Sequence, residues 1–445
     1  MSNAGALKET VCRSIDENRD RIIGVGEAIM DDPELGFKEH RTADKVQGVF
    51  TDLGLEFDSG LGLTGVKAVL RGGRPGPTVA LMGELDALQV PGHPRANPDT
   101  QAAHACGHNA QIAGLMGAAV GLQSAGIAEE LAGNIVFLAV PAEEYVEIDY
   151  RLGLVREGKT SFLCGKQELI KLGHFDDVDM AVMIHTKSPA REDGTHGVGL
   201  SSNGFLAKTV TFRGVAAHAG GAPEQGVNAL YAAQLALAGI NSHRETFRDE
   251  DCVRVHPIIT KGGDLVNVIP SEVRLETYVR AKRAEAIQDA AARVDACLKG
   301  AAMAMRCRVE IDTVPGNLPL NNDPILRDLF RENAATLFEE DGYRDYPHGG
   351  GSTDAGDLSQ LMPVLHPVMA GAHGEPHSVD WHIADKDNGY VSPAKTLAMM
   401  AVDLLADDAD TGRRVLHEFT PGMSRDEYLS QQQGIFRTEN FDGGA

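Results

Sequence analysis

The sequence lacks several features that define whole classes of proteins. Its six cysteines are scattered without the spacing of a disulfide framework, as is typical of reduced thiols in a chain of 445 residues. No apolar run approaches the length of a membrane span. The N-terminal residues show no apolar segment behind a basic start, as a secretory signal would. We therefore expect a cytoplasmic protein that does not bind membranes.

Basic residues are also scarce. Lysine and arginine number 41 against 64 aspartates and glutamates, which gives a formal net charge of -23. An acidic surface repels polyanions, so we expect no nucleic-acid partner. Hydrophobic residues make up 42% of the chain, enough to bury a core, and the length favours two or three domains over one.

Apolar runs that look like strands alternate with helical patterns in the first part of the chain. Such runs lie at 65–70, 77–88, 133–144 and 178–186, and a small-residue apolar helix is predicted at 110–126. Continuous apolar strands separated by helices are typical of a parallel sheet covered by helices on both faces. In such sheets, ligands bind at the carboxyl ends of the strands.

The pattern changes near residue 203. Residues 203–314 follow the order strand, helix, strand, strand, helix, strand, which predicts a ferredoxin-like α+β domain. Because alternation resumes afterwards, we interpret this domain as an insertion. The fold expected is α/β, with a larger, mostly parallel-sheet domain covered by helices and formed by 1–202 and 315–445. The last forty or so residues are polar and weakly patterned, and we expect a C-terminal tail there.

The stretch HACGH carries Cys106 and His108 two residues apart. In an extended segment such residues point to one side, so both could bind one metal ion. A thiolate needs a cation to lower its pKa, and a divalent metal supplies one. A structural cysteine beside a hydrogen-bonded histidine explains the pair equally well, because two ligands are too few for a metal site.

Acidic residues end two of the apolar runs. Glu143 and Glu144 are adjacent, and two carboxylates at a buried strand end need a cation or a proton to be tolerated. Asp86 ends another run, where its carboxylate could orient a ligand histidine. For an isolated Glu-Glu pair, a solvated acidic turn is the simpler interpretation.

Histidines occur at similar places. His185 ends an apolar run, although a core histidine bonded to the backbone would give the same pattern. The stretch GAHGEPHSVDWH adds His373, His377 and His382. One cysteine, several histidines and two glutamates at successive strand ends have the composition of a transition-metal site.

The inserted region offers three further candidates. His218 lies in a Gly/Ala-rich loop, where it could stabilise an oxyanion, although a turn histidine without a role is the simpler interpretation. Asn267 and Arg280 follow, and arginine suits a substrate carboxylate through its bidentate fork, although most arginines form surface salt bridges. The segment HGGGSTDAGDL lacks the ending of a phosphate-binding loop, so we reject that function.

Together these stretches resemble a known family. GELDAL, HACGHN, PAEE, DVDMAVMIHT, FRGVAAHAGGAPEQGVNAL, NVIPSEVRLETYVRA and GSTDAGD occur in the order found in the metal-dependent exopeptidases and amidohydrolases that include carboxypeptidase G, the aminoacylases and hippurate hydrolase. The variants GELDAL, CGHN and STDAGD are most similar to the branch of the aminobenzoyl-glutamate hydrolases. The resemblance covers about residues 20–400.

The resemblance implies a role for each candidate. Five residues match metal-ligand positions for one or two ions of manganese or zinc: Cys106, His108, Glu144, His185 and His377. Glu143 matches the general base, and Asp86 matches the residue behind the metal site. His218 resembles a histidine of a lid domain that also dimerises, so a homodimer or higher homo-oligomer is implied. Arg280 and Asn267 match positions that hold the carboxylate or oxyanion of a small-molecule substrate.

The implied reaction is hydrolysis of a C–N bond in a small aromatic amine or amide that carries a carboxylate. Deamination of 5-nitroanthranilate to 5-nitrosalicylate and ammonia is our most specific expectation. The alternative is cleavage of aminobenzoyl-glutamate, an acyl-amino acid or a dipeptide. A catalytically silent binding protein is disfavoured, because such a relative would be free to lose Glu143.

The chain departs from the family's pattern directly after PAEE. An extra stretch, roughly 145–163, stands where a glycine-rich turn is usual. Because it follows the expected base and a ligand, we expect it to shape the substrate pocket. Its charged residues Arg151, Arg156 and Lys159 could equally belong to a solvated flap.

Overall fold

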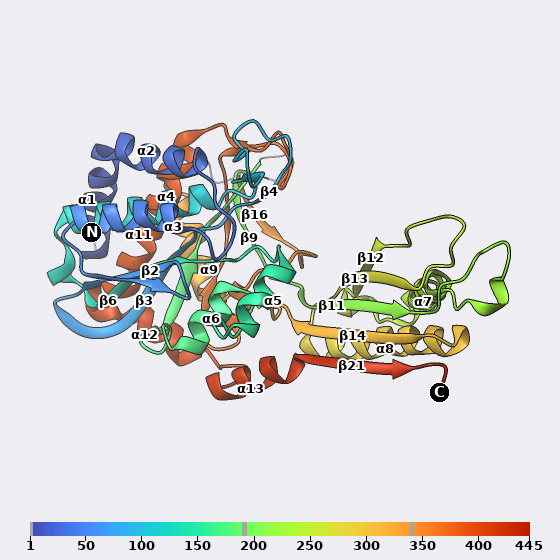
Figure 1. The fold of residues 1–445 in the computed structure, drawn as a ribbon. Coiled ribbons are helices and arrows are strands. Elements are labelled where there is room, and N and C mark those ends of the chain that lie inside the picture. Colours follow the sequence, from blue (N-terminus) through green and yellow to red (C-terminus); the bar gives the residue numbers. More distant parts are fainter. Residues whose placement is uncertain (1–2, 189–193, 339–341) are drawn as a thin grey trace. The chain divides into compact units, whose positions relative to one another are not determined.

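The computed structural model describes residues 3–188, 194–338 and 342–445 (Figure 1). The chain forms two compact units. The first comprises residues 1–200, 321–347 and 357–422, and the second comprises residues 201–320, 348–356 and 423–445. Within the described ranges, no helix is long and apolar enough to cross a membrane.

The first unit is built on a six-stranded sheet in the order β1-β2-β6-β3-β7-β17. Its strands are β1 (Phe57–Leu61), β2 (Gly65–Arg71), β6 (Ala132–Val140), β3 (Arg74–Glu84), β7 (Met180–Met183) and β17 (Val364–Leu365). β6, β3, β7 and β17 run parallel to one another, whereas β1 and β2 add antiparallel pairings. The prediction of an α/β fold with a mostly parallel sheet is confirmed.

The first unit also contains helices around this sheet (Figure 1). They are α1 (Asn3–Glu17), α2 (Arg19–Met30), α3 (His40–Asp52), α4 (His108–Ala125), α5 (Ile148–Arg156), α6 (Gly165–Leu172), α9 (Pro324–Ala334), α11 (Ser392–Leu405) and α12 (Asp410–Glu418). α4 contacts α1, α2, α11 and β3. All its residues from His108 to Leu122 are buried, as expected for a helix that is apolar all round.

Smaller sheets complete the first unit. One has the order β16-β9-β18-β8, and two others pair β4 with β5 and β19 with β20. Their bounds are β4 (Leu88–Gln89), β5 (Ala102–Ala103), β8 (His185–Lys187), β9 (His196–Gly199), β16 (Tyr343–Tyr346), β18 (Val368–Ala370), β19 (Ala372–His373) and β20 (His382–Ile383). The apolar run at 178–186 therefore does not form one strand. It is divided between β7 and β8, which belong to different sheets.

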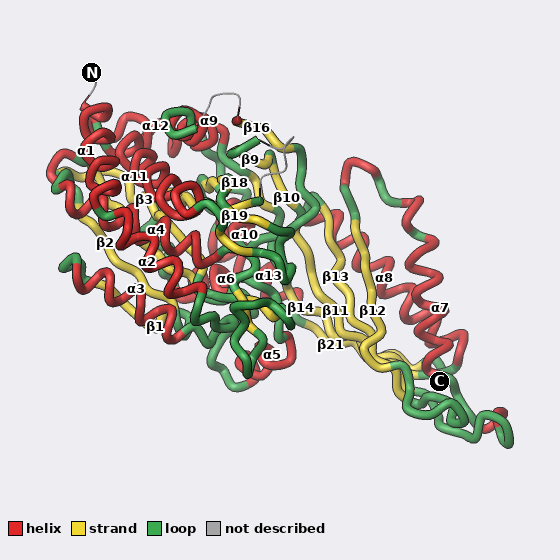
Figure 2. The backbone as a smooth tube through the Cα atoms, turned by 90° about the horizontal axis from the view of Figure 1, so that it is seen from above, coloured by secondary structure: helices red, strands yellow, loops and turns green. Residues whose placement is uncertain are grey.

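The second unit contains an antiparallel sheet in the order β12-β13-β11-β14-β21. Its strands are β11 (Gly204–Arg213), β12 (Arg254–Lys261), β13 (Glu272–Ala281), β14 (Arg308–Pro315) and β21 (Arg437–Asp442), and its helices are α7 (Ala229–Ser242), α8 (Ala284–Met305) and α13 (Arg425–Ile435). β11 to β14 with α7 and α8 have the element order predicted for 203–314. Figure 2 shows α7 and α8 beside the strands. Short elements elsewhere are β10 (Ser201–Ser202), β15 (Leu320–Asn321) and α10 (Ala355–Ser359).

The C-terminal segment differs from the expected tail. Residues 423–445, assigned from sequence to the larger domain, group with the second unit. β21 pairs with β14 in antiparallel register, from Arg308 opposite Asp442 to Thr313 opposite Arg437. The side chains of this edge strand are exposed or half-buried, so the sequence carries no apolar alternation there.

Replacing either of two helical glycines by alanine tests this packing, because the two substitutions should change the free energy of unfolding in opposite directions. A Cβ at Gly121 of α4 would lie 2.3 Å from Cγ1 of Ile15, whereas a Cβ at Gly24 of α2 would meet nothing within 4 Å. We expect Gly121→Ala to lower the free energy of unfolding by about 1–3 kcal/mol through overpacking. Gly24→Ala should raise it by about 0.5–1 kcal/mol through helix propensity. Urea denaturation of both variants would measure this, and equal effects would contradict the packing described.

Candidate metal centre and active site

Three parallel strands end level with one another. Glu84 at the end of β3 lies opposite Val140 at the end of β6, and Met82 lies opposite Met183 at the end of β7. The segments that follow these strands carry Asp86, the two glutamates 143–144, and His185. As predicted, parallel strands bring their carboxyl ends, and the polar residues behind them, to one edge of the sheet.

Cys106 and His108 reach this edge from a turn and not from an extended segment, so the expected extended geometry is wrong. His108 is the first residue of α4, and Gly107 before it has φ +101. A Cβ at Gly107 would lie 2.3 Å from Cγ2 of Thr186. Glycine therefore permits both the left-handed turn and the close approach, and the turn directs both side chains toward the strand ends.

The side chains of Cys106, His108 and His185 converge. Their potential ligand atoms all lie within 4.8 Å of one another, and Cys106 Sγ is 3.3 Å from Nε2 of His185. The Nδ1 atom of His185 is 2.6 Å from the Thr186 carbonyl oxygen. A proton on Nδ1 would leave Nε2 free to bind a metal.

A second group consists of Cys106, Glu144 and His377, again within 4.8 Å. Nε2 of His377 lies 3.3 Å from Oε1 of Glu144. His377 belongs to the loop between β19 and β20, and its backbone N–H donates to the Ala105 carbonyl at 2.7 Å. The side chain of His377 is half exposed, whereas that of Glu144 is largely enclosed. His373 and His382 face each other across β19 and β20, and both are exposed.

Asp86 is fully buried and bonds to both groups. Its carboxylate accepts the Glu144 backbone N–H at 2.9 Å, and its Oδ1 is 3.2 Å from Nδ1 of His108. The same Nδ1 is 2.8 Å from the Asp86 carbonyl oxygen. The Nε2 atom of His108 therefore faces the cluster, as a ligand atom would. The predicted general base, Glu143, lies nearby, with Oε2 4.0 Å from Nε2 of His108.

Two charged residues beside the cluster had no role in the sequence analysis. The Oε2 atom of Glu84 is 3.0 Å from Nε2 of His108, and Glu84 forms a third potential ligand group with His108 and Glu143. Its other oxygen is 2.6 Å from Nζ of Lys166, whose side chain is fully buried. Gln111 also donates to Glu84, at 2.6 Å. The position of Glu84 at the end of an apolar strand could have identified it as a site residue. Nothing in the local sequence indicated that Lys166 is buried.

His366 was also missed. Its ring centroid lies 5.7 Å from that of His185, and burial lowers its pKa to about 3. It follows the apolar residues 364–365, so the signal was the same as for His185: an apolar strand that ends in histidine.

The turn that carries Glu143 and Glu144 rests on two buried ionisable groups. Glu39 accepts the Ala142 N–H at 2.7 Å and the Thr64 hydroxyl at 2.7 Å. Burial and the Asp86 charge raise the pKa of Glu39 to about 7. Arg151 donates to the carbonyl of Leu163 at 2.6 Å and to that of Ala142 at 3.3 Å.

Arg151 lies on α5, within the extra stretch. It is fully buried, and its guanidinium carbon lies 5.3 Å from the Phe37 ring centroid, whereas Arg156 and Lys159 are exposed. For Arg151 the expectation of a solvated flap is therefore wrong, since its hydrogen bonds attach the stretch to the turn that carries Glu143.

The electrostatics of the cluster favour a cation. Burial and the Glu144 carboxylate raise the pKa of Cys106 far above its usual value, so a thiolate there requires positive charge nearby. Burial lowers the pKa of His185 and keeps it neutral, as a metal ligand must be. Burial alone would lower the pKa of His108, but Glu84, Cys106 and Asp86 together raise it well above the usual value.

The donor set fits a divalent transition metal. Nε2 of His108 and Oε1 of Glu144 are buried and make no well-aligned hydrogen bond with the residues described, although Glu84 and His377 lie close to them. One thiolate, three imidazoles and a carboxylate suit zinc, manganese or a similar ion.

The remaining candidates lie in the second unit. His218 is exposed, and its Nδ1 accepts the backbone N–H groups of Gly220 at 3.2 Å and Gly221 at 2.9 Å. Its neighbour Ala219 donates to the Asn267 carbonyl at 2.9 Å, so the two predicted loops lie side by side. Arg280 lies on β13 and is half-buried. These three residues belong to the second unit, whereas the metal-binding cluster belongs to the first unit.

Fold and site together define a class: a two-unit α/β protein with a Cys/His/Glu cluster at the carboxyl edge of its main sheet. The family model "Peptidase family M20/M25/M40" matches residues 80–401. The chain belongs to this family, and the family resemblance predicted from the motifs is confirmed. It is accordingly a metal-dependent hydrolase that acts on C–N bonds.

Individual relatives support the assignment. An Xaa-Arg dipeptidase of Mus musculus is 29% identical over 90% of this chain and 89% of its own. An indole-3-acetyl-aspartic acid hydrolase of Enterobacter agglomerans is 30% identical over 77% of each chain. One of the p-aminobenzoyl-glutamate hydrolase polypeptides of Escherichia coli is 27% identical over 67% of this chain and 58% of its own.

Two solved structures share the fold. A dinuclear metal-binding M20 peptidase of Bacillus subtilis has a TM-score of 0.67 at 23% identity, covering 88% of this chain and 99% of its own. An aminobenzoyl-glutamate utilization protein of Klebsiella pneumoniae has a TM-score of 0.62 at 24% identity, covering 87% and 97%.

Buried Arg151 and exposed Arg156 on the same helix form a matched pair. Arg151→Met removes the donor to the Leu163 carbonyl and the positive charge near Asp86, so we expect the free energy of unfolding to fall by about 1–3 kcal/mol. Arg156→Met should change it by less than about 0.5 kcal/mol, as is usual at the surface. Urea titrations would compare them, and equal stability of both variants would show that Arg151 does not anchor the stretch.

Metal retention tests the ligand cluster directly. Cys106→Ser should lower metal affinity at least about tenfold, since a hydroxyl replaces the thiolate. Cys12→Ser, in α1, is the matched control and should retain the metal of the unaltered protein. Elemental analysis after dialysis against graded chelator would measure both. Equal metal content in the two variants would exclude Cys106 as a ligand.

Proposed function

We propose that the chain hydrolyses the amide bond of an N-acyl amino acid or dipeptide with a free carboxylate, a group that includes aminobenzoyl-glutamate. The observation that carries the proposal is the convergence of Cys106, His108 and His185 with the two glutamates of the PAEE turn. The names of the relatives support this substrate class, because those described above act on dipeptides or acyl-amino acids.

The residues have the following roles in this proposal. Cys106, His108, Glu144, His185 and His377 hold one or two ions of manganese or zinc. When bound, a divalent cation acts as a Lewis acid that lowers the pKa of water and polarises the scissile carbonyl. Asp86 fixes the His108 ring and the backbone of the PAEE turn through its three close contacts.

Glu143 is the general base. Its carboxylate accepts a proton from the attacking water and returns it to the departing nitrogen, so a carboxylate and a free amine leave the site. Arg280 and Asn267 bind the substrate carboxylate, and His218 stabilises the negative charge on the carbonyl oxygen. The homodimer or higher oligomer implied by the resemblance is part of the same proposal.

Deamination of 5-nitroanthranilate, the expectation from sequence, is the second candidate. The relatives fit the amide reaction better. What favours the second candidate is the extra stretch, because Arg151 attaches it directly to the turn of Glu143. Ammonia release from nitroanthranilate and amine release from aminobenzoyl-glutamate, measured with manganese or zinc added, would decide between them.

Glu143→Gln tests the assigned base. We expect turnover to fall about 10²–10⁴-fold, because the amide cannot accept the proton of water. Metal content should be unchanged, whereas Glu144→Gln should lose metal. Steady-state assays and elemental analysis of the same preparations would separate the two roles. Unchanged turnover in Glu143→Gln would overturn the mechanism.

A further inference from the structure

Three polar side chains of the second unit form a hydrogen-bonded chain that the metal centre does not use. Oγ of Ser201 lies 2.9 Å from Nδ1 of His348, and Nε2 of the same ring lies 2.9 Å from Oδ1 of Asn203. Ser201 and Asn203 stand just before β11, and His348 precedes three glycines in the stretch HGGGSTD. All three residues belong to the second unit. Serine, histidine and asparagine in this order suit a nucleophile, a base and the group that orients the base.

A backbone carbonyl fixes the direction of each hydrogen bond in this chain. Nδ2 of Asn203 donates to the Cys252 carbonyl oxygen at 3.3 Å, so the amide oxygen Oδ1 faces the histidine. An amide oxygen only accepts, which assigns the proton of the neutral His348 ring to Nε2 and leaves a lone pair on Nδ1. The Ser201 hydroxyl therefore donates to Nδ1, as a nucleophile donates to its base.

The His348 ring is held in its neutral form. Burial and the charge of Lys282 both lower its pKa below the usual value of histidine. A general base must be neutral at the working pH in order to accept a proton. Ser201 and His348 are half-buried, whereas Asn203 is fully buried. The serine and the histidine are thus partly exposed to solvent, and the asparagine orients the ring from the interior.

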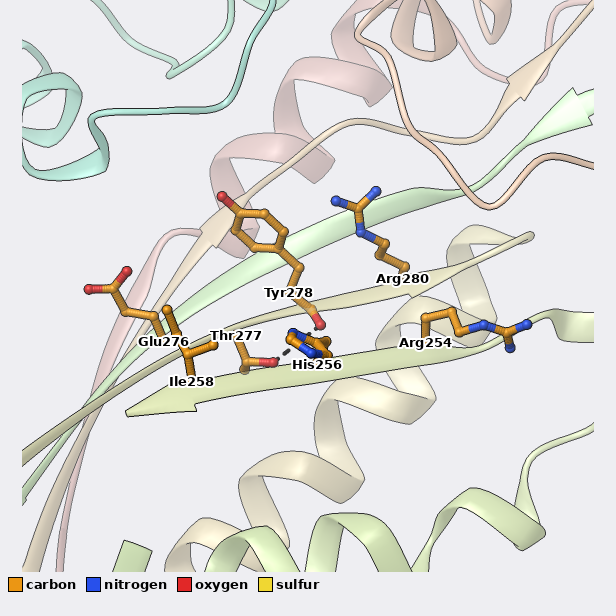
Figure 3. Close-up of a pocket in the computed structure, with 7 residues that line it drawn as sticks. All are labelled: Arg254, His256, Ile258, Glu276, Thr277, Tyr278 and Arg280. Atoms are coloured by element: carbon orange, nitrogen blue, oxygen red, sulfur yellow. Dashed lines mark hydrogen bonds between the residues drawn. The ribbon is translucent and has the colours of Figure 1, made fainter. Parts of the chain in front are cut away.

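The backbone holds these segments together without the help of the three side chains. Gly349 donates its N–H to the Ser201 carbonyl at 2.8 Å, and Asn203 donates its own to the Gly349 carbonyl at 3.1 Å. The glycine-rich loop is also attached to β13, because Arg280 donates to the Ser352 hydroxyl at 3.1 Å. Figure 3 shows Arg280 among the residues that line a pocket of about 400 Å³. The chain of side chains is therefore not needed to pair the two segments.

We propose that Ser201, His348 and Asn203 form a second hydrolytic site, which needs no metal and acts on aryl esters of small acyl groups. The proposal goes beyond amide hydrolysis and does not depend on it. Ser201 and His348 are the catalytic residues, and Asn203 is a positioning residue. An aryl ester suits the site because a phenolate leaves readily, whereas an amide nitrogen must be protonated as it leaves. The half-buried position of Ser201 favours a small acyl group.

The reaction has two steps. Oγ of Ser201 attacks the ester carbonyl carbon while Nδ1 of His348 takes the hydroxyl proton, and this proton passes to the departing phenolate. Water then attacks the acyl carbon and gives its proton to Nδ1. The bond to Oγ breaks, Oγ regains a proton, and a carboxylic acid leaves. Within the described ranges, the exposed backbone N–H groups of Gly350 and Gly351 have no hydrogen-bond partner, so they are available to the developing oxyanion.

The first test measures p-nitrophenolate release from p-nitrophenyl acetate by metal-loaded Glu143→Gln protein, which lacks the proposed base of the metal centre. We expect the reaction to persist in this variant. Adding Ser201→Ala or His348→Ala should lower kcat/KM at least about tenfold, since general-base catalysis typically contributes about 10²–10⁴-fold. Ser242→Ala is the matched control, because this exposed serine donates to the Ala238 carbonyl at 2.9 Å, and it should leave the rate unchanged. Loss of the reaction in Glu143→Gln alone, or an undiminished rate after Ser201→Ala, would overturn the inference.

The positioning role of Asn203 has its own readout. Asn203→Ala should lower kcat for the ester about tenfold and leave KM unchanged, because the residue acts through the His348 ring and does not touch the ester. Asn203→Asp keeps an oxygen acceptor for Nε2 and should restore most of kcat. An equal kcat in Asn203→Ala and in the unaltered protein would contradict this role.

A fluorophosphonate provides a test that needs no variant. Its phosphorus forms a bond to Oγ of Ser201 as fluoride leaves, and Nδ1 of His348 takes the hydroxyl proton. Mass spectrometry of the digested, metal-loaded protein should locate the adduct on Ser201. An unlabelled Ser201 would overturn the inference. Because this labelling requires no turnover at the metal centre, its result is independent of whether the chain hydrolyses amides.

Discussion

The carboxylate of Asp86 joins three elements that arise far apart in the sequence. It follows β3, it contacts the His108 ring at the start of α4, and it accepts the backbone N–H of Glu144 after β6. Because Asp86 is fully buried, these contacts are made at low dielectric, where losing one of them is costly. The orientation of His108 and the path of the PAEE turn therefore depend on one residue, through both its backbone carbonyl oxygen and its carboxylate, and the remaining candidate ligands are arranged around it.

The surroundings of Asp86 are arranged by charge. Glu84, Glu39 and the two glutamates of the turn lie close to it, and burying so many carboxylates requires compensation. The protein supplies it in three ways: Lys166 forms an ion pair with Glu84, Arg151 lies near Asp86, and Glu39 has a pKa raised to about 7. A divalent cation at the cluster would supply the rest, so metal binding and the stability of this edge of the sheet are linked.

The sequence predicted most of the arrangement of strands and helices, and it predicted the part of the site that lies at strand ends. Continuous apolar runs located β3 and β6, and the geometry of parallel strands then brings Asp86 and the two glutamates together. Residues placed by long-range packing were not predictable. Lys166 and Arg151 are charged and locally resemble surface residues, yet tertiary contacts bury both. Likewise, β21 has no apolar alternation, because an edge strand with exposed side chains needs none.

The half-exposed side chain of His377 sets this candidate ligand apart from the enclosed side chains of His108 and Glu144. It is borne by a loop and not by the main sheet, and the backbone contact with Ala105 connects that loop to the Cys106 turn. The same loop is also held at its far end, where Trp381 is buried and its carbonyl oxygen lies 2.8 Å from Nε2 of His93. His377 is therefore a half-exposed donor on an anchored loop, and the enclosed donors beside it form a preformed half-site.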